Sequence, residues 1–237
     1  MGKVKTILVV EDQTDLRELI AFNLEREGYT CRRCSDGDAA LGQIRRDPPD
    51  LIILDRMLPN TSGDEVIMRL KRKPDTALIP IIMLTAKAEE SDELVGFAMG
   101  ADDYVIKPFS MKALVARVAA LLRRLDGAAG AAADHQLSSG PVRVDTERYE
   151  VTVDGVEVAL TMTEFRLLSA LVAAQGRLRS RDELIDRALG PDVAVTDRTV
   201  DVHIASLRKK LGQAAPCLQT VRGAGYRWRP PTSADDQ

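Results

Sequence analysis

The sequence predicts two domains: a doubly wound α/β domain of the flavodoxin-like kind, with a parallel five-stranded sheet, and then an α+β winged helix-turn-helix domain. Short apolar runs alternate with helical stripes over residues 5–124. A stretch rich in Gly, Ala and Ser follows, without core-forming periodicity. The rest reads as strands, helices and a hairpin. We therefore expect a first domain over 1–125, a linker over 126–140, and a second domain with a short C-terminal tail over 141–237.

Strands and helices of the first domain are predicted from two different hydrophobic periods. The expected strands are the apolar or β-rich runs 5–10, 29–34, 51–54, 79–84 and 103–106. Between them lie helical stripes, formed by Leu16, Leu19, Ile20 and Leu24; Ala39, Ala40, Leu41 and Ile44; Val66, Ile67 and Leu70; Leu94, Phe97 and Ala98; and Leu114, Val115, Val118, Leu121 and Leu122. This alternation predicts βαβ units and a parallel sheet.

The second domain opens with alternating apolar residues over 142–160, which predict antiparallel strands. A helix is expected after a cap at Thr161 or Thr163, and a second after the capping-box sequence Ser-Arg-Asp-Glu. A third helix is expected over 197–211 and a glycine-rich hairpin over 218–228. Sheet, three helices and terminal hairpin together indicate a winged helix-turn-helix.

Composition separates the two halves by charge. The chain is 45% hydrophobic and 29% charged, with a net charge of -3, as in ordinary soluble proteins. Residues 175–229 hold eleven Lys/Arg against six Asp/Glu, whereas residues 1–125 hold nineteen against twenty. The basic C-terminal segment suggests a separate task. Since no run of about 18 apolar residues occurs, we expect no membrane span, and the absence of a signal peptide favours the cytoplasm.

Cys31 and Cys34 form a C-x-x-C pair, which can indicate redox or metal chemistry. They lie on a predicted strand, where positions three apart point to opposite faces, and no second pair accompanies them. We interpret them as plain strand residues, and three cysteines in all suit a reducing compartment.

Polar side chains follow four of the predicted strands directly: Glu11 and Asp12, Asp55, Thr85, and Lys107. In doubly wound sheets functional groups gather at the carboxyl ends of the strands, so these side chains should converge. Singly, an Asp after a strand is usually a helix cap and a Lys-Pro usually a loop. Their joint placement at one edge favours a functional site.

The expected cluster predicts a Mg²⁺ site and phosphoryl chemistry. Three carboxylates in one cleft repel each other, and a hard dication with oxygen ligands removes that conflict. Lys107 adds a positive charge and Thr85 a hydroxyl. Holding a phosphoryl group needs mainly such positioning and charge neutralisation.

The segments "ILVVEDQ", "DLIILDRMLPNTSG", "IIMLTA" and "GADDYVIKPF" resemble the receiver domain of two-component response regulators, over residues 4–124. The resemblance implies that Asp55 accepts a phosphoryl group from a sensor histidine kinase, and that a cis peptide bond precedes Pro108. It implies Mg²⁺ ligands at Glu11, Asp12, Asp55 and the Met57 main-chain carbonyl, and phosphoryl-binding or switch residues at Thr85, Tyr104 and Lys107.

Two alternatives to this reading stay open. A metal-dependent phosphatase with an aspartyl nucleophile usually has a second acid two residues later, where this chain has Met57. A phosphorylation-independent DNA-binding regulator with a vestigial receiver is the other, and the intact acidic site argues against it.

The predicted helix over 197–211 has two distinct faces at 100° per residue. Its core stripe is Val200, Ile204, Leu207 and Leu211, and its opposite face carries Arg198, Val202, Ala205, Ser206 and Lys209. Val202 suits contact with a thymine methyl in the major groove, or is simply one exposed apolar residue.

The C-terminal half resembles the winged-helix domain of the OmpR/PhoB family of transcription regulators, over residues 141–229. The segments that carry this are "LTMTEFRLLSALVA", "SRDELIDRAL", "DRTVDVHIASLRKKLG" and "QTVRGAGYRW". The resemblance implies a transcription factor rather than an enzyme, with double-stranded DNA in tandem or palindromic half-sites and RNA polymerase as partners. It implies DNA contacts by Arg198, Thr199, Val202, His203, Ser206, Arg208, Thr220 and Arg222.

Three departures from the family pattern alter these expectations. Phosphate-type members carry two arginines where this chain has Ala205 and Ser206, so we expect either that the DNA sequence that is read differs or that affinity depends more on dimerisation. The loop "LGPDVAVTD" lacks the Trp and Glu with which they meet the polymerase sigma subunit. The resemblance also implies a homodimer with salt bridges from Asp102, Asp103, Arg117 and Arg124, but Glu93 and Ala113 replace another usual pair, which predicts a thinner charge network.

Overall fold

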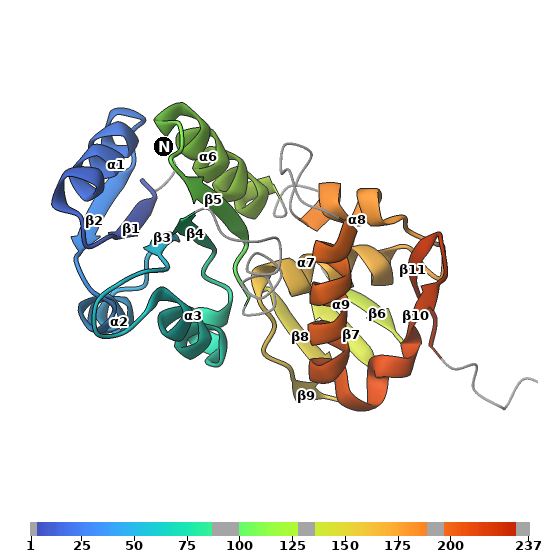
Figure 1. The fold of residues 1–237 in the computed structure, drawn as a ribbon. Coiled ribbons are helices and arrows are strands. Elements are labelled where there is room, and N and C mark those ends of the chain that lie inside the picture. Colours follow the sequence, from blue (N-terminus) through green and yellow to red (C-terminus); the bar gives the residue numbers. More distant parts are fainter. Residues whose placement is uncertain (1–3, 87–99, 128–135, 189–196, 231–237) are drawn as a thin grey trace, which may run out of the picture. The chain divides into compact units, whose positions relative to one another are not determined.

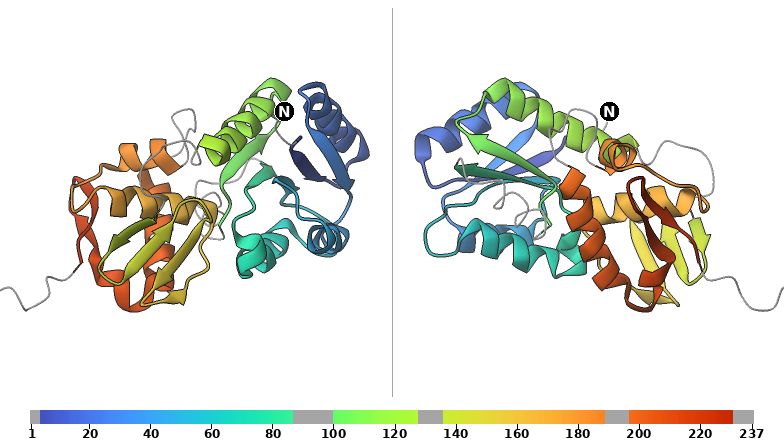
Figure 2. Two further views of the ribbon diagram at one scale, coloured as in Figure 1. Left: turned by 180° about the vertical axis from the view of Figure 1, so that it is seen from behind. Right: turned by 45° about the vertical axis from the view of Figure 1, so that its right-hand side comes forward.

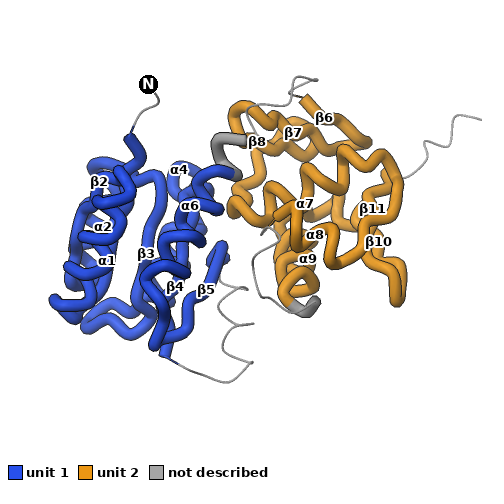
Figure 3. The backbone as a smooth tube through the Cα atoms, turned by 90° about the horizontal axis from the view of Figure 1, so that it is seen from above, with its two compact units in different colours: residues 1–126 blue, residues 127–237 orange. Residues whose placement is uncertain are grey.

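The computed structural model describes residues 4–86, 100–127, 136–188 and 197–230 (Figure 1). The chain divides into two compact units, residues 1–126 and 127–237 (Figure 3), each with its own core. The predicted fold classes, a doubly wound α/β domain and a winged helix-turn-helix domain, are both confirmed. In the part of the chain that the structure describes, no helix is long and apolar enough to cross a bilayer.

The first unit alternates strands and helices along the chain. Its elements are β1 (Thr6–Val10), α1 (Thr14–Arg26), β2 (Thr30–Cys34), α2 (Gly37–Arg46), β3 (Leu51–Asp55), α3 (Gly63–Lys71), the short α4 (Pro74–Ala77), β4 (Ile81–Ala86), β5 (Asp103–Lys107) and α6 (Met111–Gly127). All strand pairings are parallel, in the order β2-β1-β3-β4-β5. The predicted stripe of Leu94, Phe97 and Ala98 lies outside the described residues.

Helices cover both faces of the sheet, and successive side chains of each strand point to opposite sides. On β1, Ile7 and Val9 pack with α1 and α6, whereas Leu8 and Val10 pack with α2 and α3. Figure 2 shows the two helix layers on either side of the sheet. This double coverage explains why β3 is buried along its whole length, up to and including Asp55.

The second unit contains an antiparallel sheet, three helices and a hairpin. Its elements are β6 (Gln136–Ser139), β7 (Val142–Asp145), β8 (Glu150–Val153), β9 (Val156–Glu157), α7 (Met162–Ala173), α8 (Arg181–Ala188), α9 (Asp197–Leu211), a 3-10 turn (Gly212–Cys217), β10 (Leu218–Val221) and β11 (Gly225–Trp228). The sheet order is β6-β7-β8-β9, and β10 pairs with β11. The apolar sides of the three helices meet in one core, as the periodicity predicts.

The structured elements reach into both ends of the predicted linker over 126–140. Helix α6 continues to Gly127, and β6 already begins at Gln136. Leu137 explains the second difference, since it pairs with Val144 in register and is half-buried. One apolar residue among polar ones carried too little periodicity to indicate a strand.

Candidate functional site

Three carboxylates meet where β1 and β3 end. Glu11 and Asp12 directly follow β1, and Asp55 is the last residue of β3. One oxygen from each carboxylate lies within 4.8 Å of the others. Glu11 and Asp55 are buried, while Asp12 is exposed. The neighbouring strand ends thus bring the predicted acidic residues together at one edge of the sheet.

Lys107 joins this cluster from the end of β5. Its Nζ lies 2.8 Å from Glu11 Oε2 and 3.0 Å from Asp55 Oδ2. The peptide bond between Lys107 and Pro108 is cis, as expected. One ammonium against three carboxylates leaves the cluster with excess negative charge.

Burial acts on the pKa values of Glu11 and Lys107 in opposite directions, but the pKa of each group is raised overall. Burial raises the pKa of Glu11, the hydrogen bond from Lys107 partly offsets this, and the charge of Asp55 raises it further. Burial acts to lower the pKa of Lys107, but its hydrogen bonds to Glu11 and Asp55 outweigh burial and the net shift is upward. The lysine therefore stays charged, and the site favours bound cations.

The backbone around Asp55 is held by tight local packing. A Cβ on Gly63 would lie 2.2 Å from the Asp55 carbonyl oxygen, so only glycine fits at the start of α3. The side chain of Ser62 caps α3 by accepting the N–H of Glu65. The Met57 N–H donates to Asp55 Oδ1 at 3.3 Å, while the Met57 side chain is 73% exposed. The main chain of Met57, not its side chain, therefore faces the acidic site.

Thr85 lies on β4, next to β3, and Tyr104 lies on β5, the edge strand beyond β4. Thr85 is buried at the end of β4 and donates its hydroxyl to the Ala86 carbonyl at 3.1 Å. Tyr104 on β5 is half-buried and packs against the core under α2 and α3. In the β4–β5 register Tyr104 pairs with Met83, so Tyr104 lies deeper in the sheet than Thr85. Thr85 is thus the nearer of the two to the strand ends that carry the acids.

The donor set at this edge fits a hard divalent cation. Its three side-chain groups are carboxylates, the ligand type that Mg²⁺ prefers in proteins. Asp12 is open to solvent while the other two acids are buried, so water and a substrate oxygen can complete an octahedral shell. With Lys107 alongside, the arrangement can bind a phosphoryl group beside Asp55.

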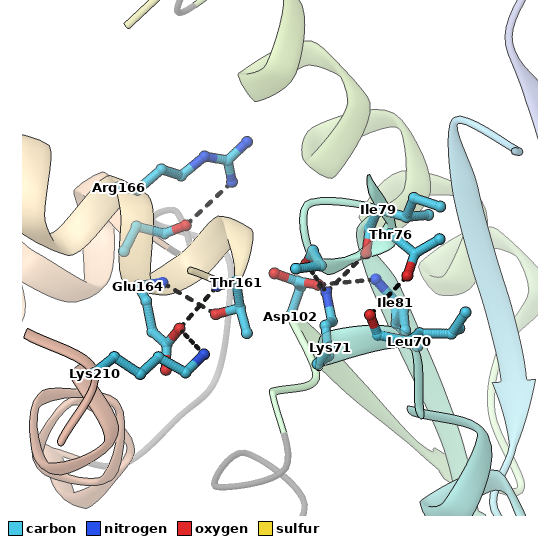
Figure 4. Close-up of polar contacts among 12 residues, drawn as sticks. Leu70, Lys71, Thr76, Ile79, Ile81, Asp102, Thr161, Glu164, Arg166 and Lys210 are labelled. Carbon is cyan, nitrogen blue, oxygen red and sulfur yellow. Dashed lines mark hydrogen bonds and ion pairs between the residues drawn. The ribbon is translucent and has the colours of Figure 1, made fainter. Parts of the chain in front are cut away.

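Asp102 does not lie where a dimer contact requires it. Its side chain is only 1% exposed, its Oδ2 lies 3.1 Å from Lys71 Nζ, and the same oxygen accepts the Ile81 N–H at 2.9 Å (Figure 4). Lys71 Nζ also donates to the carbonyl oxygens of Ala77 and Ile79. The expectation of an inter-subunit bridge from Asp102 is therefore corrected: this carboxylate is used inside the first unit.

The other three residues expected at the dimer interface differ from one another. Asp103 accepts two hydrogen bonds from Arg117 Nη1 within the same chain, both at 2.9 Å. The Arg117 side chain remains 27% exposed, so it lies at the surface that β5 and α6 share. The side chain of Arg124 lies outside the described residues.

Three of the DNA contacts predicted on α9 are corrected by its packing. Thr199 and His203 are 2% and 1% exposed, because they lie next to the core stripe of α9. Ser206 donates its hydroxyl to Glu164 Oε1 at 2.6 Å and so points toward α7. The family resemblance implied the contacts of Thr199 and His203, and the face analysis placed Ser206 outside, but the buried side of α9 is wider than its four apolar residues suggested.

The open face of α9 is narrower than expected. Ala205 and Lys209 are exposed and Val202 is half-buried. The side chain of Arg198 lies outside the described residues, as does the loop over 189–196. This face, which we call the α9 open face, consists of Val202, Ala205 and Lys209.

The β10–β11 hairpin is tied to α9 by Arg208. The guanidinium donates to the Leu218 carbonyl at 2.7 Å and to Thr220 Oγ1 at 2.8 Å. Thr220 and Arg222 are both exposed on this hairpin. Arg208, expected on DNA, thus holds the hairpin, while Arg222 extends the positive surface.

Four further residues have roles in the structure that the sequence analysis did not predict: Lys71, Glu164, Asp201 and Tyr226. Asp201 on α9 accepts from the Tyr226 hydroxyl at 2.6 Å and from Arg181 Nε at 2.8 Å. Burial first, and then the hydrogen bond to Asp201, raise the pKa of Tyr226. Glu164 was detectable, since it stands three residues after Thr161 in a capping box. Neither Asp201 nor Lys71 has a local signal, because their partners are distant in sequence.

Cys31 and Cys34 lie on β2, as expected, and Cys217 ends the 3-10 turn. Cys31, Cys34 and Cys217 are free, and Cys34 and Cys217 are buried. Burial raises the pKa of Cys31 to about 11, with a further contribution from Glu25. A thiol with a raised pKa is a poor nucleophile and a poor metal ligand.

Comparison with known families assigns both halves of the chain. Residues 7–119 match the response regulator receiver domain family, and residues 155–228 match the C-terminal domain family of transcriptional regulatory proteins. The phosphate regulon transcriptional regulatory protein PhoB of Pseudomonas aeruginosa is 47% identical over 225 residues, covering 94% of this chain and 97% of the relative. The sensory transduction protein RegX3 of Mycobacterium tuberculosis is 42% identical, covering 94% and 98%.

Solved structures agree with these matches. A mutant of RitR superposes with a TM-score of 0.80 at 28% identity, covering 96% of this chain and all of the other. The response regulator DrrB, a Thermotoga maritima OmpR/PhoB homolog, superposes with a TM-score of 0.51 at 26% identity, with the same coverage.

Proposed function

The chain belongs to the OmpR/PhoB family of two-component response regulators, and from that premise we propose that Asp55 is its phosphoacceptor. The single observation that carries this is the convergence of Glu11, Asp12 and Asp55 with Lys107 at one sheet edge. Asp55 is the only one of the three acids that ends a buried central strand. Its carboxylate is therefore held rigidly at the mouth of the site.

In the proposed reaction an oxygen of Asp55 attacks the phosphorus of a phosphohistidine on a sensor kinase. The phosphorus–nitrogen bond breaks, an acyl phosphate forms on Asp55, and the imidazole nitrogen keeps the electron pair and takes up a proton. Lys107 holds positive charge beside the transferred group, and the Met57 N–H fixes the carboxylate orientation. We propose Glu11, Asp12, Asp55 and the Met57 carbonyl as Mg²⁺ ligands; when bound, the ion would neutralise charge on the phosphoryl oxygens.

The buried position of Thr85 supports a role for its hydroxyl at the phosphoryl group, with Tyr104 responding beneath it. Among the described residues the Thr85 hydroxyl bonds only the carbonyl of its neighbour Ala86, so rotation of one side chain frees the hydroxyl. Tyr104 is half-buried and its backbone N–H is held by Asp103 at 2.8 Å. We propose these two residues as the switch that reports phosphorylation.

We propose that phosphorylation favours a homodimer that uses the surface of β5 and α6. Arg117, half-buried and oriented by Asp103, supports this proposal, and Arg124 is its further expected partner. Such a dimer would read tandem or palindromic half-sites about one helical turn apart. RNA polymerase is the proposed downstream partner. Because a kinase and promoter DNA must both be reached, we expect the chain to act in the cytoplasm.

The C-terminal domain binds DNA in this family, and we propose the α9 open face and the β10–β11 hairpin as its contact surface. In this proposal Val202 meets a thymine methyl, Lys209 and Arg222 meet phosphates or bases, and Arg198 and Thr220 add further contacts. Arg208 would act mainly by holding the hairpin against α9.

Intact-mass measurement after incubation with acetyl phosphate and Mg²⁺ tests the phosphoacceptor. Wild-type protein should gain one phosphoryl group, and Asp55→Ala should gain none. Asp64→Asn is the matched control, since Asp64 lies nearby in an ion pair with Arg56 but outside the cluster. If wild type gains no mass, or Asp55→Ala gains as much, the assignment fails.

Selection from random duplex DNA by the phosphorylated protein tests the output domain. We expect one enriched sequence with a repeated half-site. If Asp55→Ala selects the same duplex with equal affinity, the chain is instead a phosphorylation-independent regulator with a vestigial receiver.

A further inference from the structure

Glu164 is a buried carboxylate at the beginning of α7 that has more partners than a helix cap needs. Its side chain is 2% exposed. Its Oε2 accepts the Thr161 N–H at 2.8 Å, and the Thr161 hydroxyl accepts the Glu164 N–H in return (Figure 4). These two bonds complete a capping box. The other hydrogen bonds that the Glu164 carboxylate accepts come from another helix.

Both remaining partners of Glu164 lie on α9. Ser206 donates its hydroxyl to Oε1 at 2.6 Å, and Lys210 Nζ lies 2.6 Å from Oε2. Because Ser206 and Lys210 are four residues apart, they lie one above the other on the same side of α9. One carboxylate therefore holds α9 at two points a turn apart, which fixes both its rotation and its shift along its axis.

The α9 open face lies directly beside this attachment. At 3.6 residues per turn, Val202, Lys209 and Ala205 lie about 40°, 60° and 100° around the helix from Ser206. On the far side of that face, about 140–160° from Ser206, Asp201 and Arg208 bond the β10–β11 hairpin and its surroundings. The open face is thus bounded by polar attachments on both edges.

We propose that Glu164 is a positioning residue for DNA recognition: through Ser206 and Lys210 it sets the rotation of α9 and so decides which side chains face the base edges. This inference rests on the proposed DNA-binding role of the open face. It also gives Ser206 a different task from the base contact expected for it, since its hydroxyl is an internal anchor.

The matched control is the capping box of α8, which lacks any such second task. Ser180 N–H donates to Glu183 Oε2 and Glu183 N–H to Ser180 Oγ, both at 3.1 Å. The Glu183 side chain is 51% exposed. Its other described contact is an ion pair at 3.8 Å with Arg179, four residues earlier in the chain. Glu183→Gln therefore perturbs a cap of the same chemistry without releasing α9.

The test compares affinity for two duplexes: one selected from a random pool by the wild-type protein, and one of random sequence. In Glu164→Gln one oxygen remains, which can serve the cap or α9 but not all three donors. Ser206→Ala removes one anchor and leaves the cap intact. We expect each variant to lower the ratio of selected to random affinity, Ser206→Ala by about 3- to 10-fold, as one lost hydrogen bond implies. Ser206→Thr keeps a hydroxyl at this position and should retain the affinity ratio of the wild type.

Melting temperature separates positioning from capping. Glu164→Gln and Glu183→Gln should both lower it, but Glu183→Gln should keep the affinity ratio of the wild type. The inference is overturned if Glu164→Gln and Ser206→Ala retain the wild-type ratio, or if Glu183→Gln lowers it equally. If the wild-type protein selects no DNA sequence, the proposed DNA contact fails, and this inference fails with it. That failure can be told apart from failure of the Glu164 inference alone, because it is seen in the wild type before any variant is measured.

Discussion

The acidic site of the first unit and the proposed DNA-binding surface of the second use charge in opposite ways. At the sheet edge, Glu11 and Asp55 are withdrawn from water and held by Lys107. On the second unit, Lys209 and Arg222 stand in solvent, while the buried Glu164 only holds the helix that carries the open face. The first arrangement suits transfer of a charged group, and the second suits adjustable contact with a charged polymer.

Replacing Lys71 by Met should give the largest loss of stability and tests how strongly the first unit depends on buried pairs. The change leaves Asp102 buried without its cation, which costs about 3–5 kcal/mol in such sites. Urea denaturation measures the loss. Asp47→Ala breaks the exposed pair with Arg32 and should cost about 0–1 kcal/mol. Equal losses of stability in the two variants would contradict the expected dependence of the first unit on its buried ion pair.

Lys107→Met should slow phosphorylation by acetyl phosphate about 100-fold, as loss of one preorganised charge at a reacting centre does. The variant should also lose stability without metal, because Glu11 and Asp55 then repel each other unopposed. Millimolar Mg²⁺ should recover much of that stability. Phosphorylation is followed by mass, and stability by thermal melting with Mg²⁺ or chelator. Lys112→Met, an exposed neighbour on α6, should behave as wild type; a deficit there would point to general damage.

Arg222→Ala should weaken binding to selected and random duplexes by the same factor, about 5-fold, if it meets phosphate. The slope of log affinity against log salt concentration should decrease by about 1. Fluorescence anisotropy at several salt concentrations measures both. Arg143→Ala removes an exposed arginine of β7, outside the hairpin segment, and should change neither. A loss confined to the selected duplex would instead assign Arg222 to base reading.

Tyr226→Phe should have the smallest effect, about 1 kcal/mol at neutral pH, from loss of the hydrogen bond to Asp201. The pKa of Tyr226 is raised from 10.0, chiefly by burial, so the folded wild type keeps this hydroxyl protonated longer than the unfolded chain does. That contribution is complete below pH 10 and is lost as pH rises through the raised value. The gap between wild type and variant should therefore narrow above pH 10 in urea titrations. If the difference in stability between wild type and variant widens above pH 10, the Tyr226 hydroxyl is not buried as described.

The two halves also differ in how far the sequence predicts them. Asp55, Glu11 and Lys107 follow strands, and topology alone places parallel strand ends together, so their convergence could be expected. Ser206, His203 and Asp102 were assigned by their positions in a motif. The directions of the Ser206 and Asp102 side chains depend on Glu164 and Lys71, which are distant in sequence, and His203 is buried beside the α9 core. A pattern reports which face a residue occupies, whereas a bond to a distant partner decides where its side chain points.

We propose that phosphorylation of Asp55 controls DNA binding by the second unit. The most direct measurement is the affinity of the whole chain for its selected duplex, with and without acetyl phosphate and Mg²⁺, in wild type and Asp55→Ala. We predict that phosphorylation tightens wild-type binding by at least about 5-fold, the lower range for coupled sites, and leaves Asp55→Ala unchanged. Equal affinity of the phosphorylated and unphosphorylated wild type would contradict the claim.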